Sequence, residues 1–563
     1  MTKQYHVGID FGTSQTKICV SNLGQLTDGS RKYFFHKFSQ AQTNPYFLPS
    51  TLKLTEDGFC QFGIRESNPL RYFKMKALFN DEQRFNIAAN EKINQDVLAK
   101  YPEICCILYL AYCIIDLKQS LSLQNEYLKE EKGEQTTKTV TSNISRLIGK
   151  IRWKNSEKKQ DATLTAESAQ EEHKYQFTIG IPTEHDKNEF NYYRRSKQYE
   201  MLYLAVQLSK DFKSVSLFTQ VKIIHLLSRI EYYFKGIESI ENGTRVPNRF
   251  YQETQGLFVI AETTAGIEPA RSELKTELTN IVEKNNNFEQ PLYNFKRRNQ
   301  GNYMTMDVGA GTTDVSFFRF NVWVREDTKV SEIKVRYYAS KSIEAACNTL
   351  YYNYLFRNPN DPCVDLNYND ERIEAISQFD FNKINIVHWQ SSQQNFRNYL
   401  FRQIRQPDLF GRVNQIYNGA LRCNWHRSYI IAKGCKVYGG GCRFNEFSSG
   451  VMTLHNGGVR VSGLETETEL GRWFTGVETP IIRSLVSKEG IPLTYTEKTE
   501  ITESFDLLNV ALGLAMLDHH NRPDSWIERD DNDNPLLGLN GPNNYDDGGM
   551  AKYNVFNRDW LKK

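Results

Sequence analysis

Apolar and polar residues alternate in two widely separated stretches of the chain, and a glycine-containing turn interrupts each of them. The first stretch has apolar residues at Val7, Ile9, Ile18 and Val20, on either side of the segment "DFGTSQTK". The second, "YMTMDVGAGTTDVSFFRF" (303–320), has an apolar run before and after its own glycines. Alternation bounded by such turns is typical of paired strands. We therefore predict two β-hairpins, one in each stretch.

Strand-like and helix-like segments also alternate along the rest of the chain. "YFLPSTLKL" (46–54) and "KYQFTIGIPTE" (174–184) are predicted to be extended. "PEICCILYLAYCIIDLKQSL" (102–121) is predicted to be a helix with a buried face, because a proline opens a long apolar run. "GLFVIAETTAGIEPA" (256–270) is predicted to form a buried strand followed by a turn of small residues. This alternation indicates an α/β protein.

Several regions have the polar composition of surface insertions. The segment 125–175 is dominated by Lys, Glu, Gln, Thr and Ser, and we expect a partly mobile insertion there. The ranges 190–255 and 445–500 are further candidate insertions. The tail, 521–563, is rich in Asn, Asp, Gly and Pro, and is predicted to be flexible or loosely docked.

Charge and composition exclude some classes of function. Among 563 residues, 70 Lys and Arg balance 67 Asp and Glu, and the net charge of +3 gives no reason to expect a nucleic-acid partner. The longest apolar run, Ile104 to Ile115, is shorter than the ~18–20 residues of a membrane-spanning helix, so no span is predicted. The start of the chain shows no signal-peptide pattern, and we expect a cytoplasmic protein. The 10 cysteines are scattered, and no zinc site is predicted.

Both predicted turns carry residues suited to a phosphate and a metal ion. Backbone N–H groups and short hydroxyl side chains converge at such a turn, which favours an anion. A carboxylate beside it, Asp10 or Asp307, would repel a bare phosphate, whereas a hydrated Mg²⁺ between carboxylates and phosphates removes the conflict. A third glycine-rich segment, "CKVYGGGCRF" (435–444), allows its backbone to approach a ligand closely. Together, the three segments indicate a site for a phosphate and a metal ion more specifically than any one of them does alone.

These motifs resemble those of the actin-like ATPase superfamily, which includes actin, the DnaK-type seventy-kilodalton heat-shock chaperones and the sugar kinases. "GIDFGTSQTK" is similar to the first phosphate loop of the family, "DVGAGTTDVSFF" to the second and "VYGGGCRF" to the adenosine loop. "IGIPTE" and "AETTAGI" resemble segments around its first crossover, and "VALGLAML" resembles its second crossover. The resemblance extends from residue 5 to about 517, and is closest to the chaperones' nucleotide-binding domain.

The resemblance implies an α/β fold of two lobes, each built on a ribonuclease-H-like mixed sheet, with ATP or ADP and Mg²⁺ in the cleft between them. Lobe I would span 1–268 and lobe II 269–502, with a helix returning to lobe I at 503–520 and the tail at 521–563. Only 46 residues follow Leu517 (563 − 517), so no peptide-binding domain of the chaperone type is expected there.

The resemblance also implies roles for individual residues. Asp10 and Asp307 would hold the metal, and Glu262 and Asp314 would join them in catalysis. Arg443 would stack against the adenine base. The nucleotide would otherwise be bound by residues of the three loops, namely Gly12, Thr13, Ser14, Lys17, Gly309, Gly311, Thr312, Thr313, Gly439, Gly440 and Gly441.

Two alternatives exist for the lysine that binds the phosphates. Lys17 lies seven positions after Asp10, where actin and several of its bacterial relatives carry this lysine. The chaperones use a lysine from the other side of the cleft, for which Lys74 and Lys76 are candidates, although a solvated helix face would explain both equally well. Either source of the charge, or both, would fit the sequence.

The leading functional hypothesis is an ATP-hydrolysing conformational switch, similar to the chaperones' ATPase, that acts on or regulates a protein partner through its insertions. The alternative is a filament-forming ATPase of the actin type, which Lys17 favours and which would make self-assembly the interaction. A small-molecule kinase ranks third, because Thr-Thr-Asp at 312–314 is the chaperone and actin form of the second loop.

Overall fold

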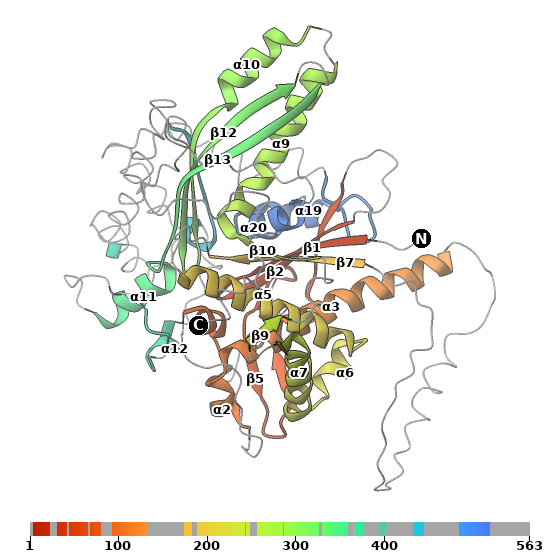
Figure 1. The fold of residues 1–563 in the computed structure, drawn as a ribbon, viewed down its shortest axis with the longest axis vertical. Helices are drawn as coiled ribbons and strands as arrows, with labels where there is room; N and C mark the ends of the chain where they lie inside the picture. The colour runs from red at the N-terminus through yellow and green to blue at the C-terminus, as the bar shows by residue number, and fades with distance from the viewer. Residues whose placement is uncertain are drawn as a thin grey trace.

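A computed structural model describes most of the chain up to residue 517 (Figure 1). Helices and strands alternate in it, which confirms the predicted α/β class. Of the predicted insertions, the ranges 132–173 and 444–483 lie outside the described residues, as does the whole tail from 518. The described residues are 4–22, 31–41, 44–65, 68–79, 93–131, 174–182, 189–241, 244–247, 256–284, 287–325, 329–357, 364, 366–368, 370–376, 395, 398–399, 432–443 and 484–517.

The first half of the chain builds a mixed, six-stranded sheet. Its strand order is β10-β7-β1-β2-β3, and β4 pairs with β2 beside this path. β1 runs antiparallel to β2 and parallel to β7, which in turn runs parallel to β10. β1 and β2 form the first predicted hairpin, which is confirmed. The strands are β1 (Gln4–Phe11), β2 (Gln15–Asn22), β3 (Tyr33–Phe35), β4 (Leu48–Pro49), β7 (Lys174–Ile181) and β10 (Leu257–Ala261).

A second sheet repeats this arrangement with later residues. Its order is β13-β12-β11-β14, with β11 antiparallel to β12, β12 antiparallel to β13, and β11 parallel to β14. β14, β11, β12 and β13 thus match β7, β1, β2 and β3 in both order and direction. The second predicted hairpin, β11 and β12, is confirmed. The strands are β11 (Gly301–Val308), β12 (Thr313–Arg325), β13 (Val330–Ile343) and β14 (Ala432–Tyr438).

Helices cover both faces of the first sheet, and the alternation along β2 shows how. Ile18 and Val20 join the core that contains α3 and α5, whereas Cys19 joins the core that contains α20. α20 therefore lies on the opposite face of this sheet, and Figure 1 shows it between the two sheets. The predicted helix at 102–121 is confirmed as part of α3. The helices are α3 (Pro102–Glu131), α5 (Glu189–Lys210) and α20 (Phe505–Met516).

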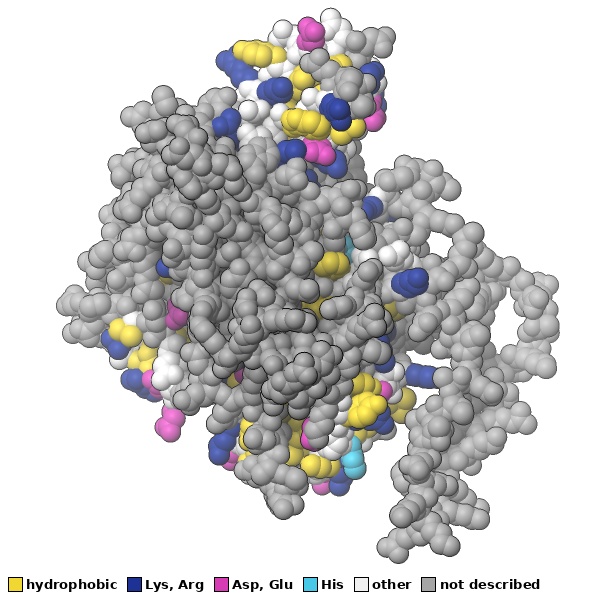
Figure 2. Space-filling model, in the orientation of Figure 1, with side chains coloured by type: hydrophobic (Ala, Val, Ile, Leu, Met, Phe, Trp, Pro, Cys, Tyr) yellow, Lys and Arg dark blue, Asp and Glu magenta, His cyan; other side chains and the backbone are white. Residues whose placement is uncertain are grey.

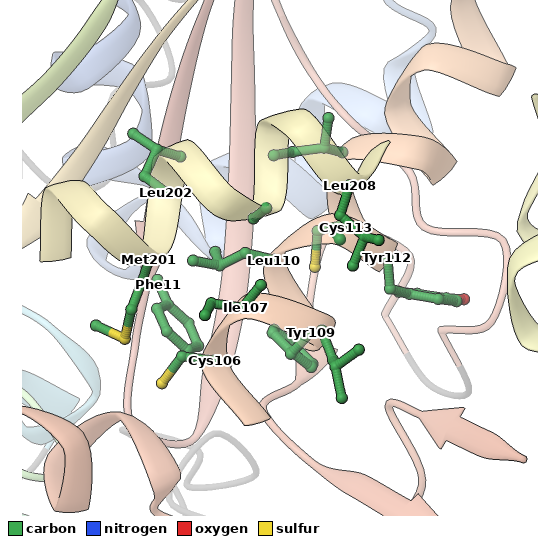
Figure 3. Close-up of a cluster of buried hydrophobic side chains, with 14 of the residues drawn as sticks. Phe11, Cys106, Ile107, Tyr109, Leu110, Tyr112, Cys113, Met201, Leu202 and Leu208 are labelled. Carbon is green, nitrogen blue, oxygen red and sulfur yellow. The ribbon is translucent and has the colours of Figure 1, made fainter. Parts of the chain in front are cut away.

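The packing of α3 on the first hairpin also supports a neighbouring segment. Figure 3 shows Tyr109 of α3 near Phe11 at the end of β1, and their ring centroids are 5.6 Å apart. The hydroxyl of Tyr109 donates hydrogen bonds to the carbonyl oxygens of Leu48 and Pro49, at 3.1 Å and 3.0 Å. This segment is extended, as predicted, and lies directly beside the turn between β1 and β2.

α3 bears on the expectation that no helix could span a membrane. By length and composition alone, Pro102–Ser122 is long and apolar enough to do so, a test that a buried core helix also passes. In the fold, 83% of its most apolar window is buried. Figure 3 shows Ile107 and Leu110 among side chains of α5 such as Leu202, so α3 packs as a core helix.

Smaller elements flank the first sheet. α5 also contacts α7 and the short helix α1, and α2 and α6 contact α3. The region 190–255, predicted as an insertion, thus includes α5, whose buried side chains join the main core. These elements are β5 (Leu52–Leu54), β6 (Cys60–Phe62), α1 (Phe73–Phe79), α2 (Gln95–Ala99), α6 (Val215–Thr219), α7 (Ile223–Ile237), β8 (Glu238–Glu241) and β9 (Thr244–Pro247).

α9 (Glu262–Lys284) links the two sheets and corrects one prediction. The segment after β10 was expected to form a turn of small residues, but α9 begins there, at Glu262, with no intervening turn. The small residues instead allow close packing. A Cβ atom on Gly513 of α20 would lie 1.8 Å from the carbonyl oxygen of Ala265, and one on Gly266 would lie 2.1 Å from the Tyr438 hydroxyl at the end of β14. α9 contacts both sheets as a result.

α9 and α10 cover one face of the second sheet, where Leu278 and Phe295 pack against Phe318 and Phe320 of β12. The long strands β12 and β13 run with these helices to a projecting tip (Figure 1). Among the coloured residues of that tip, Figure 2 shows charged side chains of both signs between apolar ones. The remaining elements are α10 (Glu289–Asn299), α11 (Cys347–Phe356), α12 (Ile373–Ile376), the 3-10 helix η2 (Gly440–Arg443) and α19 (Tyr495–Glu503).

Candidate functional site

The turns of the two hairpins meet at a cavity of about 380 Å³. It lies between the two sheets, because residues of the first hairpin, the second hairpin, the loop after β14 and α20 all contribute to its wall. The structure brings most of the predicted site residues together there. Those that line the cavity are Asp10, Gly12, Thr13, Ser14, Lys17, Lys74, Glu262, Asp307, Gly309, Gly311, Thr312, Gly439, Gly440 and Gly441.

The two turns are built in the same way. In the first, the N–H of Gly12 donates to the carbonyl oxygen of Gln15 at 3.1 Å, and in the second the N–H of Gly309 donates to that of Thr312 at 2.9 Å. In each hairpin the aspartate that is the last but one residue of the first strand faces the residue seven positions later. These cross-strand pairs are Asp10 with Lys17 and Asp307 with Asp314.

The turns also touch each other, and two glycines make this possible. A Cβ atom on Gly311 would lie only 2.6 Å from Oγ1 of Thr13 in the other hairpin. Gly439 has φ of +83°, and a Cβ atom there would lie 2.3 Å from Oδ1 of Asp307. A side chain at Gly439 would therefore be strained as well as crowded. Glycine at these positions lets three backbone segments converge on one cavity.

The segment 48–51 braces the first turn from behind. The hydroxyl of Ser50 donates to the carbonyl oxygen of Gly12 at 2.8 Å, and its backbone N–H donates to that of Ser14 at 2.9 Å. Both carbonyl groups are thereby held by Ser50. The turn is fixed before any ligand binds, with the side chains of Thr13 and Ser14 at the cavity wall.

Two lysines and three carboxylates lie at the floor of the cavity. Lys17 Nζ lies 2.8 Å from Asp10 Oδ2. Lys74 of α1, whose side chain is 3% exposed, places Nζ 3.1 Å from Oε1 of Glu262 at the start of α9. Lys76 does not line the cavity. Of the two chaperone-like candidates, Lys74 is thus the one beside the site, and Lys17 is there as well.

Burial and mutual repulsion shift the pKa values of these groups. Burial raises the pKa of Asp307 well above its usual value, and the nearby carboxylates of Glu262 and Asp314 raise it further. Burial also raises the pKa of Glu262, although Lys74 opposes this effect. Burial would lower the pKa of Lys17, but the carboxylates of Asp10, Asp307 and Glu262 together more than offset it, so the pKa is raised. The three carboxylates at the floor therefore carry more buried negative charge than the two lysines neutralise.

This donor set fits a hydrated magnesium ion better than a directly ligated metal. Within the described ranges, no three His, Cys, Asp or Glu side chains form a group that would hold a metal by themselves. Mg²⁺ keeps several of its waters and usually takes one or two carboxylates together with phosphate oxygens. Asp10 and Asp307, one from each hairpin and both buried, match that requirement. The raised pKa of Asp307 is also what an uncompensated cation site would show.

Two of the predicted residues do not line the cavity. Thr313 does not line the cavity, and its hydroxyl donates to the carbonyl oxygen of Ala345 at 2.9 Å. Asp314 is buried behind the wall, where Oδ2 accepts a hydrogen bond from the Thr312 hydroxyl at 3.0 Å. Arg443 ends η2, and its side chain lies outside the described residues. Thr313 and Asp314 therefore contribute to the support of the second turn.

Several residues that line one side of the cavity were not predicted from the sequence. Arg71 and Tyr72 come from the segment before α1, and Tyr72 has φ of +58°, which no local pattern indicates. Nε of Arg71 lies 3.0 Å from Glu374 of α12, and the ring of Tyr72 lies 5.6 Å from that of Tyr368. We call these two contacts the clasp, because they join the two halves of the chain beside the cavity.

Two further residues that line the cavity were also not predicted from the sequence. Asp506 opens α20, and its carbonyl oxygen accepts a hydrogen bond of 3.0 Å from the N–H of Gly439. Asn348 lies in the first turn of α11. Neither belongs to a motif of recognisable spacing, so only the fold reveals that they meet the glycine-rich loops.

No protein-family model and no curated protein matches this sequence.

Proposed function

We propose that this protein binds Mg-ATP and hydrolyses it to ADP and phosphate, as a conformational switch of the actin-like ATPase type that acts on a protein partner. The observation that carries the proposal is the convergence of two matched hairpin turns on one cavity with Asp10, Asp307 and Glu262. A ligand with several phosphates is the one that needs two such turns, lysines and a metal-binding pair of carboxylates together.

The topology supports the proposed two-lobed fold. The four strands β7, β1, β2 and β3 have the same order and directions as β14, β11, β12 and β13. Such a repeat is what two ribonuclease-H-like lobes require, and the cavity lies where the two repeats meet. Ligands of open α/β sheets commonly bind at the ends of strands.

In this proposal, some residues of the cavity bind the nucleotide and others catalyse its hydrolysis. Lys17 and Lys74 would bind phosphate oxygens, together with the N–H groups and hydroxyls of the two turns. Glu262, with its raised pKa, would orient the attacking water and accept its proton. Bound Mg²⁺, held through Asp10 and Asp307, would neutralise charge on the phosphates. The glycine-rich loop 439–441 and Asp506 would face the nucleoside.

The helices between the sheets support a switch. α9 and α20 contact each other and both sheets. A change in the angle between the two halves would therefore alter the packing of these two helices. A nucleotide that contacts both turns binds the closed arrangement better than the open one, and its hydrolysis removes some of those contacts. A partner bound to either half would sense the difference.

Glu262→Gln tests this proposal. The variant keeps the size of the side chain and an oxygen for Lys74, but it no longer accepts a proton. We expect Mg-ATP to bind with an affinity within a few-fold of the wild type, while phosphate release slows by about 100-fold. Calorimetry and a phosphate-release assay measure the two. Equal loss of binding and turnover would assign Glu262 a structural role, and a wild type that binds no ATP would overturn the proposal.

Lys17 favours the filament-forming ATPase as the second candidate, because it lines the cavity beside Asp10, as the actin-type arrangement requires. Sedimentation velocity at several protein concentrations, with Mg-ATP and with Mg-ADP, separates the two candidates. Growth into large species only with ATP would favour the filament. A small discrete particle in both states, differing only in shape, would favour the switch and direct attention to the insertions as partner-binding segments.

A further inference from the structure

The first turn of α11 is fixed against two of the glycine-rich loops. The N–H groups of Cys347 and Asn348 donate to the carbonyl oxygens of Gly309 and Ala310, at 3.2 Å and 2.9 Å. A Cβ atom on Gly441 would lie 2.8 Å from Sγ of Cys347, so the same turn also contacts the loop after β14. The start of α11 is therefore placed where the second hairpin turn meets the proposed nucleoside side of the cavity.

Asn348 lines the cavity with an amide group that is not satisfied by the protein. The residue is 2% exposed. Its Nδ2 atom is buried and has no hydrogen-bond partner in the part of the chain that the structure describes. A buried donor without a partner is unfavourable, and native proteins rarely keep one without a reason. A ligand in the cavity would supply the missing acceptor.

A second asparagine on the same helix shows the contrast. Asn353 is equally buried, but its Nδ2 donates to the carbonyl oxygens of Thr349 and Val364, at 2.8 Å and 3.0 Å. Asn353 does not line the cavity. The protein thus supplies acceptors for Nδ2 of the asparagine that lies away from the cavity, whereas Nδ2 of the asparagine at the cavity wall has none among the described residues. This difference indicates a ligand-binding role for Asn348 that Asn353 lacks.

We propose that the Asn348 side chain donates a hydrogen bond to an oxygen atom of the bound nucleotide and so contributes to its recognition. The inference rests on the proposed function, because it takes the nucleotide as the occupant of the cavity. An amide N–H group suits a ribose hydroxyl and a phosphate oxygen alike. The position of α11, between the second turn and the loop 439–441, brings both within the region that Asn348 faces.

The test compares Asn348→Leu with two matched variants. Leucine has nearly the same size as asparagine but cannot donate, so we expect the dissociation constant of Mg-ATP to rise about 10-fold, as the loss of one hydrogen bond to a ligand implies. The melting temperature of the ligand-free protein should not fall, since no protein hydrogen bond of Nδ2 is lost. Asn348→Ala serves as a second variant if leucine is not accommodated.

Asn353→Leu and Gln198→Leu are the controls. Asn353→Leu should lower the melting temperature without changing the affinity for ATP, because it breaks three hydrogen bonds to the backbone away from the cavity. Gln198 of α5 is fully buried, with unpartnered amide atoms within the described structure, and it does not line the cavity. Gln198→Leu should leave the affinity for ATP unchanged, which shows that removal of an unpartnered amide is not enough by itself.

Inorganic tripolyphosphate and 2′- and 3′-deoxy-ATP identify the acceptor. If Asn348→Leu weakens ATP and tripolyphosphate alike, the acceptor is a phosphate oxygen. If it weakens ATP but neither tripolyphosphate nor one of the deoxynucleotides, the acceptor is the hydroxyl which that deoxynucleotide lacks. Wild-type affinity of both Asn348 variants for ATP would overturn this inference and leave the proposed function intact. A wild type that binds no ATP would overturn both.

Discussion

The two hairpins at the cavity have one geometry but carry opposite charges at one matching position. Each has the same hydrogen bond across its turn, and each has a buried aspartate one residue before the end of its first strand. At the position that faces this aspartate, the first hairpin has Lys17 and the second has Asp314. Lys17 lines the cavity, whereas Asp314 lies behind the cavity wall and accepts a hydrogen bond from the hydroxyl of Thr312. A long side chain reaches the cavity from this position, and a short one supports the turn.

This difference shows how a repeated scaffold can serve two purposes. The first half contributes both lysines of the cavity, Lys17 and Lys74, and also Glu262. The second half contributes Asp307, whose pKa burial raises, and a turn stiffened by its own buried acid. Of the carboxylates at the cavity, Asp307 of the second half would therefore be stabilised most by a bound cation.

The largest effect is expected for Asp307→Ala. Loss of this carboxylate would remove the contribution of the second hairpin to the proposed metal site, and Mg-dependent ATP hydrolysis should fall at least about 100-fold. Phosphate release at saturating Mg-ATP measures it. Asp211→Ala is the control, because Asp211 pairs with Arg229 away from the cavity. Turnover at the wild-type rate in Asp307→Ala would remove the second hairpin from the catalytic site.

Lys17→Met should have the next largest effect, on affinity. A charge-assisted hydrogen bond to phosphate contributes about 1.5–3 kcal/mol, so the dissociation constant of ATP should rise roughly 10- to 100-fold. Asp314→Asn at the matching position keeps an acceptor for Thr312, and we expect a change of less than about threefold because the side chain does not reach the cavity. Titration calorimetry compares them. Equal losses in the two variants would mean that the hairpins do not differ in role.

Contact between the two turns can be tested with Gly311→Ala. The new methyl group would overlap Thr13 of the other hairpin, and the free energy of unfolding should fall by about 1–3 kcal/mol. Combining it with Thr13→Ala removes the Oγ1 atom that is overlapped, and should restore part of the loss. Urea unfolding of the two single variants and the double variant measures the coupling. Strictly additive losses would indicate that the turns are apart in solution.

The smallest effect concerns the pH dependence of stability without ligand. The pKa of Asp307 is raised in the folded state, so its contribution to stability is present below the unfolded pKa, ~3.9 for an aspartate, and is lost as the pH rises through the folded value. Asp307→Asn does not ionise. Its melting temperature should exceed that of the wild type by about 1–3 °C near pH 8, with a smaller difference at about pH 5. A difference independent of pH would contradict the shift.

Local sequence predicted the parts of the site that depend on local chemistry. The turns around Gly12 and Gly309 were predictable because alternating strands and glycines specify hairpins over a few residues. The start of α9 at Glu262 was missed, since small residues suggest a turn unless the neighbouring Tyr438 and Gly513 are known. Asn348 was missed for a similar reason. Its place depends on bonds to a loop distant in sequence, which no period in the chain records.

The clasp of Arg71 with Glu374, and of Tyr72 with Tyr368, has a kinetic consequence. It joins the two halves next to the cavity, so any separation of the halves on that side must first break an ion pair and a ring contact. The Glu374 side chain is 48% exposed, and such a pair contributes no more than about 1 kcal/mol. A barrier of that size would not trap an occupant, but would lengthen its dwell time. Ligand exchange, rather than chemistry, would then respond to whatever touches α12.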